Sequence, residues 1–157
     1  MVQLVRSDLE EFNDIIGEYL KHPDIKKMQD YCAHGDVSVL KHSLNVAKMA
    51  YYINKKYKLK ANGKTLLIGA LLHDFYLYDW HDKKLNINIF KMHGYTHPMK
   101  ACDNAIRVFN IDEDIQKVIS SHMWPLTFRS FPSSKEAMIV CLADKICALM
   151  ESFHYDK

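Results

Sequence analysis

The order of apolar and polar residues predicts a chain built mainly from helices. In the first segment, apolar side chains recur every three or four positions, which places them on one face of an α-helix. Ser7 and Glu10 have the spacing of a capping box and mark the start of this helix. Its end is expected near His22, because the proline that follows disfavours helical backbone at the residue before it. A shorter helix is expected over residues 24–31.

The same criteria predict later helices over residues 38–57, 65–74, 97–109, 112–123 and 133–153. Ser38 is placed to cap the first of these. Residues 75–95 are aromatic and polar without clear periodicity, and they are expected to form a long loop with room for a short helix. No segment alternates apolar and polar residues with the period of a strand. We therefore expect an all-α fold, a single-domain bundle of about six to eight helices over residues 1–157.

The composition limits the classes of partner and the cell compartment. With 157 residues, the chain is long enough for one hydrophobic core. Its 21 lysines and arginines balance 19 acidic residues, which argues against nucleic acid and a membrane surface as partners. No apolar run approaches the ~18–20 residues of a membrane span, and the N-terminus lacks the pattern of a signal peptide. The four cysteines form no Cys-x-x-Cys pair, so we expect reduced thiols and a cytoplasmic protein.

Two carboxylates lie where the helical pattern expects apolar side chains. Asp74 follows the apolar run of residues 66–72, and Asp144 lies in the middle of the apolar helix expected at the C-terminal end. An ionised carboxylate taken out of water costs on the order of several kcal/mol unless a cation compensates it. Each of these residues alone fits a buried ion pair as well as a functional site.

Three histidines repeat this anomaly. His42, His97 and His122 each share a helical face with apolar residues and are expected to point inward. A single inward histidine is commonly a hydrogen-bonded core residue. Five such side chains on five predicted helices favour a common site, because facing helices of a bundle can bring them together. The mixture of imidazoles and carboxylates is typical of sites for zinc, iron, manganese or a similar divalent ion.

The order of these residues resembles the signature of the HD-domain metal-dependent phosphohydrolase superfamily. The resemblance covers about residues 38–150, and the matching positions are His42, His73, Asp74 and Asp144. It implies that these four side chains bind metal. It also implies that Asp74 bridges two ions when two are present.

Two further histidines extend the resemblance to binuclear members of the superfamily. His97 and His122 are similar to the two extra histidines of those members. His93 is an alternative to His97, because it lies one helical turn away if the helix begins earlier than expected. The implied cofactor is one or two divalent ions, and Fe, Mn, Zn, Mg, Co and Ni are not distinguished by the pattern.

The substrate stays open at this point. In size and in the order of these six positions, the chain also resembles the small bacterial dinucleoside polyphosphate hydrolases of the superfamily. It departs from them at Phe75, where a lysine is usual, and after His122, where it reads Met-Trp-Pro. It also lacks the acidic pair of alarmone hydrolases, and residues 94–96 do not match the Gly-Tyr-Pro element of cyclic-dinucleotide phosphodiesterases.

The resemblance implies hydrolysis of a phosphate mono- or diester or anhydride bond in a nucleotide or other small phosphorylated metabolite, by metal-activated water. Asp74, His73 and Lys145 are the expected catalytic residues. The candidate substrate contacts are His34, Arg129, Lys145 and Trp124. Two alternatives stay open, a mixed-valent di-iron oxygenase with the same six-ligand order and a non-catalytic domain that senses a nucleotide. A homodimer is likewise an open alternative for the oligomeric state.

Overall fold

Seven α-helices account for most of the residues that the computed structural model describes, which are residues 3–78 and 87–154. The helices are α1 (Arg6–Lys21), α2 (Pro23–Lys27), α3 (Val39–Lys56), α4 (Gly63–Leu72), α5 (Ile87–Phe109), α6 (Glu113–Ser121) and α7 (Lys135–His154). Between α2 and α3 lie a 3-10 turn and an antiparallel hairpin, with the bounds Met28–Asp30, β1 (Cys32–His34) and β2 (Val37–Ser38). The predicted all-α class is confirmed, and the hairpin is an addition that the sequence pattern did not predict.

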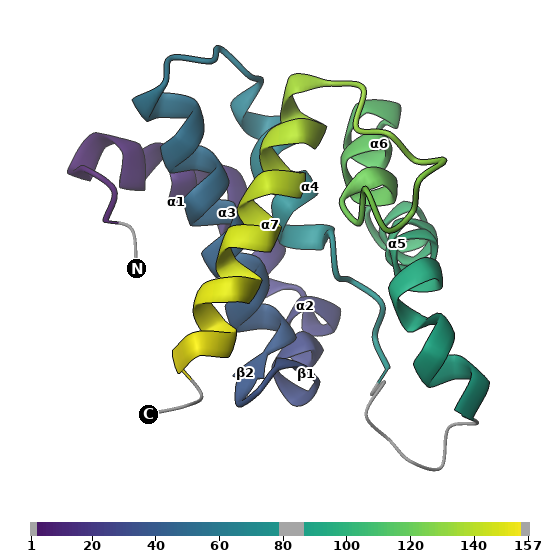
Figure 1. The fold of residues 1–157 in the computed structure, drawn as a ribbon. Helices are drawn as coiled ribbons and strands as arrows, with labels where there is room; N and C mark the ends of the chain where they lie inside the picture. The colour runs from purple at the N-terminus through teal and green to yellow at the C-terminus, as the bar shows by residue number, and fades with distance from the viewer. Residues whose placement is uncertain (1–2, 79–86, 155–157) are drawn as a thin grey trace.

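Helix α4 lies at the centre of the fold, in contact with α1, α3, α6 and α7 (Figure 1). Its residues from Leu66 to Leu72 are all buried, which explains why the helix has no polar face. Gly69 lets α6 pack closely against α4, because a Cβ added there would lie 2.6 Å from a methyl carbon of Val118. The residues that follow α4 are thereby carried into the middle of the molecule.

Apolar side chains pack in two clusters, and α4 contributes to both. Leu66, Leu67 and Leu71 belong to a cluster with residues of α1, α3 and α7. Ile68 and Leu72 belong to a second cluster with residues of α5 and α6. Since neighbouring positions of one helix are buried in different clusters, α4 fixes the relative position of the helices around it.

Several helix starts have the caps that the sequence predicts. Ser38 and Asp112 each accept a hydrogen bond from the backbone amide three residues later, as expected of N-cap residues. Ser134 caps α7 in the same way, one residue after the helix start expected at residue 133. The predicted cap at Ser7 is wrong, because α1 already begins at Arg6 and Ser7 lies in its first turn.

Helix α5 is longer than predicted. It begins at Ile87, so the loop expected over residues 75–95 is wrong for its second part, and residues 79–86 lie outside the described residues. The helix start was expected at Pro98 because proline favours the first helical turn. Pro98 instead lies inside the helix, where it removes one backbone hydrogen bond. Packing of α5 against α4 and α6 outweighs that loss.

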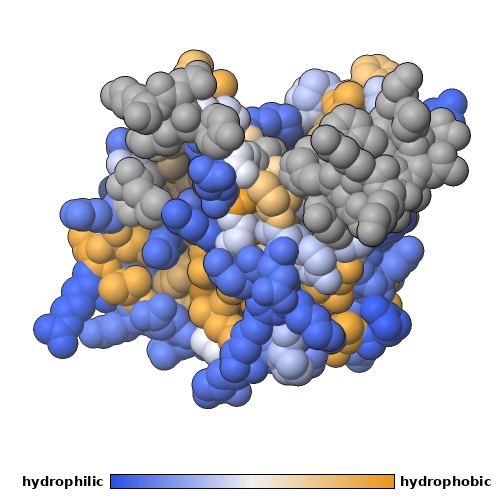
Figure 2. All heavy atoms as spheres, turned by 90° about the horizontal axis from the view of Figure 1, so that it is seen from below, coloured by the Kyte–Doolittle hydropathy of each residue, from blue (hydrophilic) through white to orange (hydrophobic). Residues whose placement is uncertain are grey.

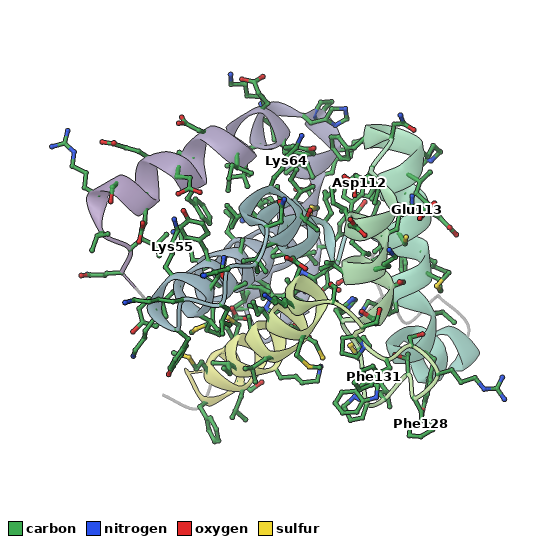
Figure 3. All side chains as sticks on the ribbon, turned by 90° about the horizontal axis from the view of Figure 1, so that it is seen from above. Lys55, Lys64, Asp112, Glu113, Phe128 and Phe131 are labelled. Carbon is green, nitrogen blue, oxygen red and sulfur yellow. The ribbon has the colours of Figure 1, made fainter. Side chains whose placement is uncertain are left out.

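The surface of the described residues is mixed in character. Seen from below, hydrophilic side chains surround smaller apolar areas (Figure 2). Phe128 and Phe131 project outward from the loop between α6 and α7 and are 82% and 56% exposed (Figure 3). Within the described ranges, no helix is both long enough and apolar enough to cross a membrane.

Candidate metal centre

The six side chains selected from the sequence converge in the interior of the molecule. Each is more than nine-tenths buried, and the set comprises His42, His73, Asp74, His97, His122 and Asp144. His73 and His122 are the residues at which α4 and α6 end, so the C-terminal ends of two helices face the centre. His42 lies in the first turns of α3, and Asp144 lies midway along α7.

Four of these side chains form one group of facing atoms, here named the four-donor group: His42 Nε2, His73 Nε2, Asp74 Oδ2 and Asp144 Oδ1. His42 Nε2 lies 3.1 Å from Asp144 Oδ1 and 3.9 Å from Asp74 Oδ2. His73 Nε2 lies 3.5 Å from Asp74 Oδ2 and 3.6 Å from Asp144 Oδ1. Ligands of one transition-metal ion have similar separations, because bonds of about 2.0–2.2 Å set neighbouring ligand atoms roughly 3–4 Å apart.

The other oxygen of Asp74 faces a second set of atoms, here named the three-donor group: Asp74 Oδ1, His97 Nε2 and His122 Nε2. His97 Nε2 lies 3.2 Å and His122 Nε2 lies 3.6 Å from Asp74 Oδ1. The two imidazole nitrogens are 2.9 Å apart. The carboxylate of Asp74 therefore contributes one oxygen to each group.

Hydrogen bonds at the outer ring nitrogens orient three of the histidines. His73 Nδ1 donates to the carbonyl oxygen of Ala70 at 2.8 Å, and His122 Nδ1 donates to that of Ile119 at 2.7 Å. His42 Nδ1 donates to a carboxylate oxygen of Glu151 at 2.8 Å. Because each acceptor fixes the proton on Nδ1, each ring turns Nε2 toward the centre, as ligand histidines commonly do.

Two atoms at the centre are buried without a hydrogen bond. They are His73 Nε2 and Asp74 Oδ1, both of which have less than 1 Å² of exposed surface. A buried polar atom without a partner costs roughly 1–3 kcal/mol, so such atoms are rare unless something else satisfies them. Each belongs to one of the two donor groups, and together with the imidazole and carboxylate donors around them they fit divalent metal ions.

A comparison with models of protein families identifies the family to which the chain belongs. The HD domain model matches residues 39–149, which is most of the chain. The chain belongs to the HD-domain family. Its buried histidine and aspartate clusters are consistent with the metal site of that family. Neither the curated proteins nor the solved structures give a significant match to this HD domain.

Both carboxylates of the HD domain's centre are held in the ionised form. Burial by itself raises the pKa of Asp74, but the three histidines around it outweigh this effect and hold that pKa well below its usual value. Burial likewise raises the pKa of Asp144, but the hydrogen bond from His42 and the nearby imidazole of His73 outweigh it, so this pKa is lowered as well. The centre therefore presents two negative charges to a cation.

The histidines of the HD domain's centre differ in charge. Burial lowers the pKa of His42, but its hydrogen bonds with Asp144 and Glu151 outweigh this and raise the pKa to about 10. The two aspartates raise the pKa of His73 in the same way, although burial opposes them. Burial, together with two neighbouring imidazoles, lowers the pKa of His122 to about 3. Near neutral pH His42 of the four-donor group thus carries a proton that a cation would displace, whereas His122 is neutral.

The candidate substrate contacts lie at different distances from the centre. The ammonium group of Lys145 donates to the carbonyl oxygen of His122 at 2.9 Å, which places it directly beside the centre. Trp124 is half-buried, and its ring packs edge to face against Phe131 with 5.4 Å between ring centroids. Arg129 is exposed on the same loop. The side chain of His34, in β1, lies outside the described residues.

Tyr76 packs against one histidine of the three-donor group, and Tyr78 packs against Tyr76. The ring centroid of buried Tyr76 lies 5.8 Å from that of His97 and 5.0 Å from that of Tyr78. Burial and the charge of Asp74 raise the pKa of Tyr78 to about 12. The aromatic residues after the His-Asp pair thus pack against the centre. The early start of α5 also places His93 one turn before His97, but the side chain of His93 is not among those described.

Sequence reasoning missed Glu151 at this centre. Its carboxylate is 10% exposed and contacts His42 through one oxygen and the amide of Asn45 through the other, at 2.8 Å each. The available signal was its position seven residues after Asp144, which places both on one face of α7. That signal identifies the face but not the partner, because His42 lies on another helix.

Proposed function

We propose that this HD domain is a metal-dependent phosphohydrolase. Its substrate would be a phosphate mono- or diester or anhydride of a nucleotide or another small phosphorylated metabolite. The observation that carries the proposal is the division of the Asp74 carboxylate between two groups of donors. A shared carboxylate of this kind suits a pair of divalent ions, and paired ions are widely used to hydrolyse phosphate bonds.

The proposed ligands follow from the two donor groups. One ion would be held by the four-donor group and the second by the three-donor group, with Asp74 common to both. Four imidazoles and two carboxylates suit transition metals such as iron, manganese, zinc, cobalt or nickel. They suit magnesium less well, because Mg²⁺ prefers oxygen ligands.

The chain's own residues would hold the ligand atoms in position, supply negative charge and exclude water from the centre. The ionised carboxylates of Asp74 and Asp144 would offset the charge of the cations, and the orienting hydrogen bonds would hold the imidazoles ready before any cation arrives. Burial of the centre strengthens every electrostatic interaction within it. When bound, divalent ions supply a Lewis acid that lowers the pKa of water toward neutrality and offsets negative charge on phosphoryl oxygens.

Residues at the edge of the centre would contact the substrate. We assign Lys145 to a phosphoryl oxygen, because its ammonium group lies beside the backbone of His122, where it also contacts Cys141. Trp124 would stack on a nucleobase, and Arg129 and His34 would contact phosphate groups. Comparison of a nucleoside phosphate with ribose phosphate tests the stacking role, and equal efficiency on both would remove it.

The activity is tested with purified protein loaded in turn with Mn²⁺, Fe²⁺, Co²⁺, Ni²⁺, Zn²⁺ and Mg²⁺ under anaerobic conditions. Phosphate release is measured from a panel of nucleotides, dinucleoside polyphosphates and sugar phosphates. Release without oxygen, abolished by Asp74→Asn, supports the proposal. The control Asp114→Asn removes an exposed acid of α6 that pairs with Lys117, and it should leave the activity unchanged.

The same experiment separates the alternatives. A strict need for iron and oxygen would identify an oxygenase instead. Binding of a nucleotide without turnover, under every metal of the panel, would identify a sensor domain. Either result would refute the phosphohydrolase proposal.

A further inference from the structure

Glu151 makes a contact that no other carboxylate among the described residues makes, because it touches a proposed ligand from the side away from the centre. One carboxylate oxygen accepts the Nδ1 proton of His42 at 2.8 Å. The opposite nitrogen of the same ring, Nε2, is the atom that faces Asp144. Glu151 therefore acts on the imidazole without lying among the donor atoms themselves.

The carboxylate of Glu151 is itself held in place. Its second oxygen accepts a hydrogen bond from the side-chain amide of Asn45 at 2.8 Å. Asn45 and His42 lie three positions apart on α3, so both contacts come from neighbouring turns of one helix. The carboxylate can rotate only by giving up one of these two hydrogen bonds.

The three oriented histidines differ in the charge of their acceptors. His73 and His122 are oriented by carbonyl oxygens of their own helices, Ala70 and Ile119, which carry no net charge. His42 alone among these three rings is oriented by an ionisable acid from another helix. An anionic acceptor raises the basicity of the imidazole and strengthens its bond to a metal more than a carbonyl does.

We propose that Glu151 is a positioning residue for His42 and makes the four-donor group the tighter of the two metal sites. The inference deepens the proposed function, since it rests on the assignment of the six ligands. It also assigns an order of loading, in which the first ion enters the four-donor group and the second enters the three-donor group.

Co²⁺ binding to the full-length protein tests this inference, with equilibrium dialysis for the number of ions and visible absorption for their coordination. The variants are Glu151→Gln, which keeps an acceptor oxygen but removes the charge, and Glu151→Ala, which removes both. We expect the dissociation constant of the tighter ion to rise about 10–100-fold in Glu151→Ala and by less in Glu151→Gln. The dissociation constant of the weaker ion should stay within about twofold of the wild-type value.

Glu136→Gln is the matched control. Glu136 lies on the same helix and also makes a hydrogen bond to another part of the chain, at 2.6 Å to the backbone amide of Asn62, but it contacts none of the six proposed ligands. Its Co²⁺ binding should equal that of the wild type. Asn45→Ala removes one hydrogen bond that holds Glu151 and leaves Glu151 itself unchanged. It should weaken binding of the tighter ion by a smaller factor than Glu151→Ala does. This variant keeps the test decisive if Glu151→Ala does not fold.

Three results would overturn the inference. Unchanged Co²⁺ binding with a lower melting temperature would mean that Glu151 only holds α3 against α7. Selective loss of the weaker ion would show that Glu151 supports the three-donor group and not the four-donor group. Equal weakening in the Glu136 control would show a general effect of α7.

The binding test stands apart from the test of activity. A wild type that releases no phosphate, with Co²⁺ binding weakened by the Glu151 variants, refutes only the proposed function. An active wild type whose Glu151 variants bind Co²⁺ normally refutes only the inference.

Discussion

The four-donor and three-donor groups share Asp74 but are built in different ways. In the four-donor group, His42 from α3 and Asp144 from α7 meet across the bundle at 3.1 Å. In the three-donor group, His122 is oriented within the last turn of its own helix. His42 of the first group carries a proton near neutral pH. The donors of the second group also come from distant parts of the chain, namely the end of α4, α5 and the end of α6, and they include the neutral His122. The difference teaches that two adjacent sites with similar ligands can respond oppositely to mutation and pH.

The largest expected effect comes from the residue that the two groups share. Asp74→Asn removes the negative charge from both groups, so we expect loss of both ions and a fall in kcat on the order of 10³-fold. Metal content by elemental analysis and steady-state phosphate release measure the two effects. If Asp74→Asn kept both ions and full turnover, Asp74 would be excluded as a common ligand.

Removal of one histidine from each group separates the two sites. His42→Ala should lose the ion of the four-donor group and His122→Ala that of the three-donor group, so each variant binds about one ion fewer than the wild type. Co²⁺ titration should then show the weaker site remaining in His42→Ala and the tighter site remaining in His122→Ala. Identical binding curves for the two variants would contradict a division into two groups.

Packing between α4 and α6 gives a third test of the comparison. Gly69→Ala places a methyl group against Val118 and should destabilise the protein by about 1–3 kcal/mol, because the closely packed helices must move apart. That shift displaces His122 from Asp74, so the three-donor group should weaken more than the four-donor group. Urea unfolding and Co²⁺ titration measure the two consequences.

Gly17→Ala is the control for this substitution. A Cβ added at Gly17 in α1 would meet nothing within 4 Å, so the change should stabilise the protein by about 0.5–1 kcal/mol through helix propensity. Stabilisation by Gly69→Ala as well would show that the interface between α4 and α6 can accommodate an added methyl group.

The smallest expected effect concerns pH. The pKa of His42 in the folded protein is about 10, above its ordinary value of 6.5. Its contribution to stability is therefore complete below about pH 6.5 and is lost as pH rises toward 10. The melting temperature of the metal-free protein should fall by a few degrees from pH 6.5 to pH 8.5, in proportion to the fraction of this contribution lost.

Metal binding should show the opposite dependence. A cation in the four-donor group must displace the same proton, so the rise in melting temperature on addition of Mn²⁺ should grow across this pH range. Thermal unfolding in EDTA and in Mn²⁺ measures both trends. If the melting temperature of the metal-free protein rose with pH, the positive charge assigned to His42 would be contradicted.

Most of the fold could be predicted because local signals decide it. Ser38 and Asp112 mark helix starts through hydrogen bonds to amides three residues away, and such short-range contacts are visible in a sequence. The start of α5 could not be placed, because residues 87–95 show no clear apolar stripe and Pro98 suggested a later beginning.

The residues of the candidate site also differ in whether local sequence signals predict them. The inward positions of His42 and Asp144 could be predicted from helical spacing, since both interrupt apolar faces. Their convergence is a property of the whole bundle and was inferred only from the number of such residues and from the resemblance. Glu151 could not be assigned a role, because a glutamate near the end of a helix is most often solvated and its partner lies 109 positions away.

The ends of α4 and α6 carry a consequence beyond the ligands they supply. Every helix has a macrodipole, and its C-terminal end bears a partial negative charge from carbonyl groups without amide partners. Since both helices end at the centre, two such fields add there, each favouring a cation by about 0.3–1 kcal/mol. The backbone thus favours a cation at the centre independently of the ligand side chains.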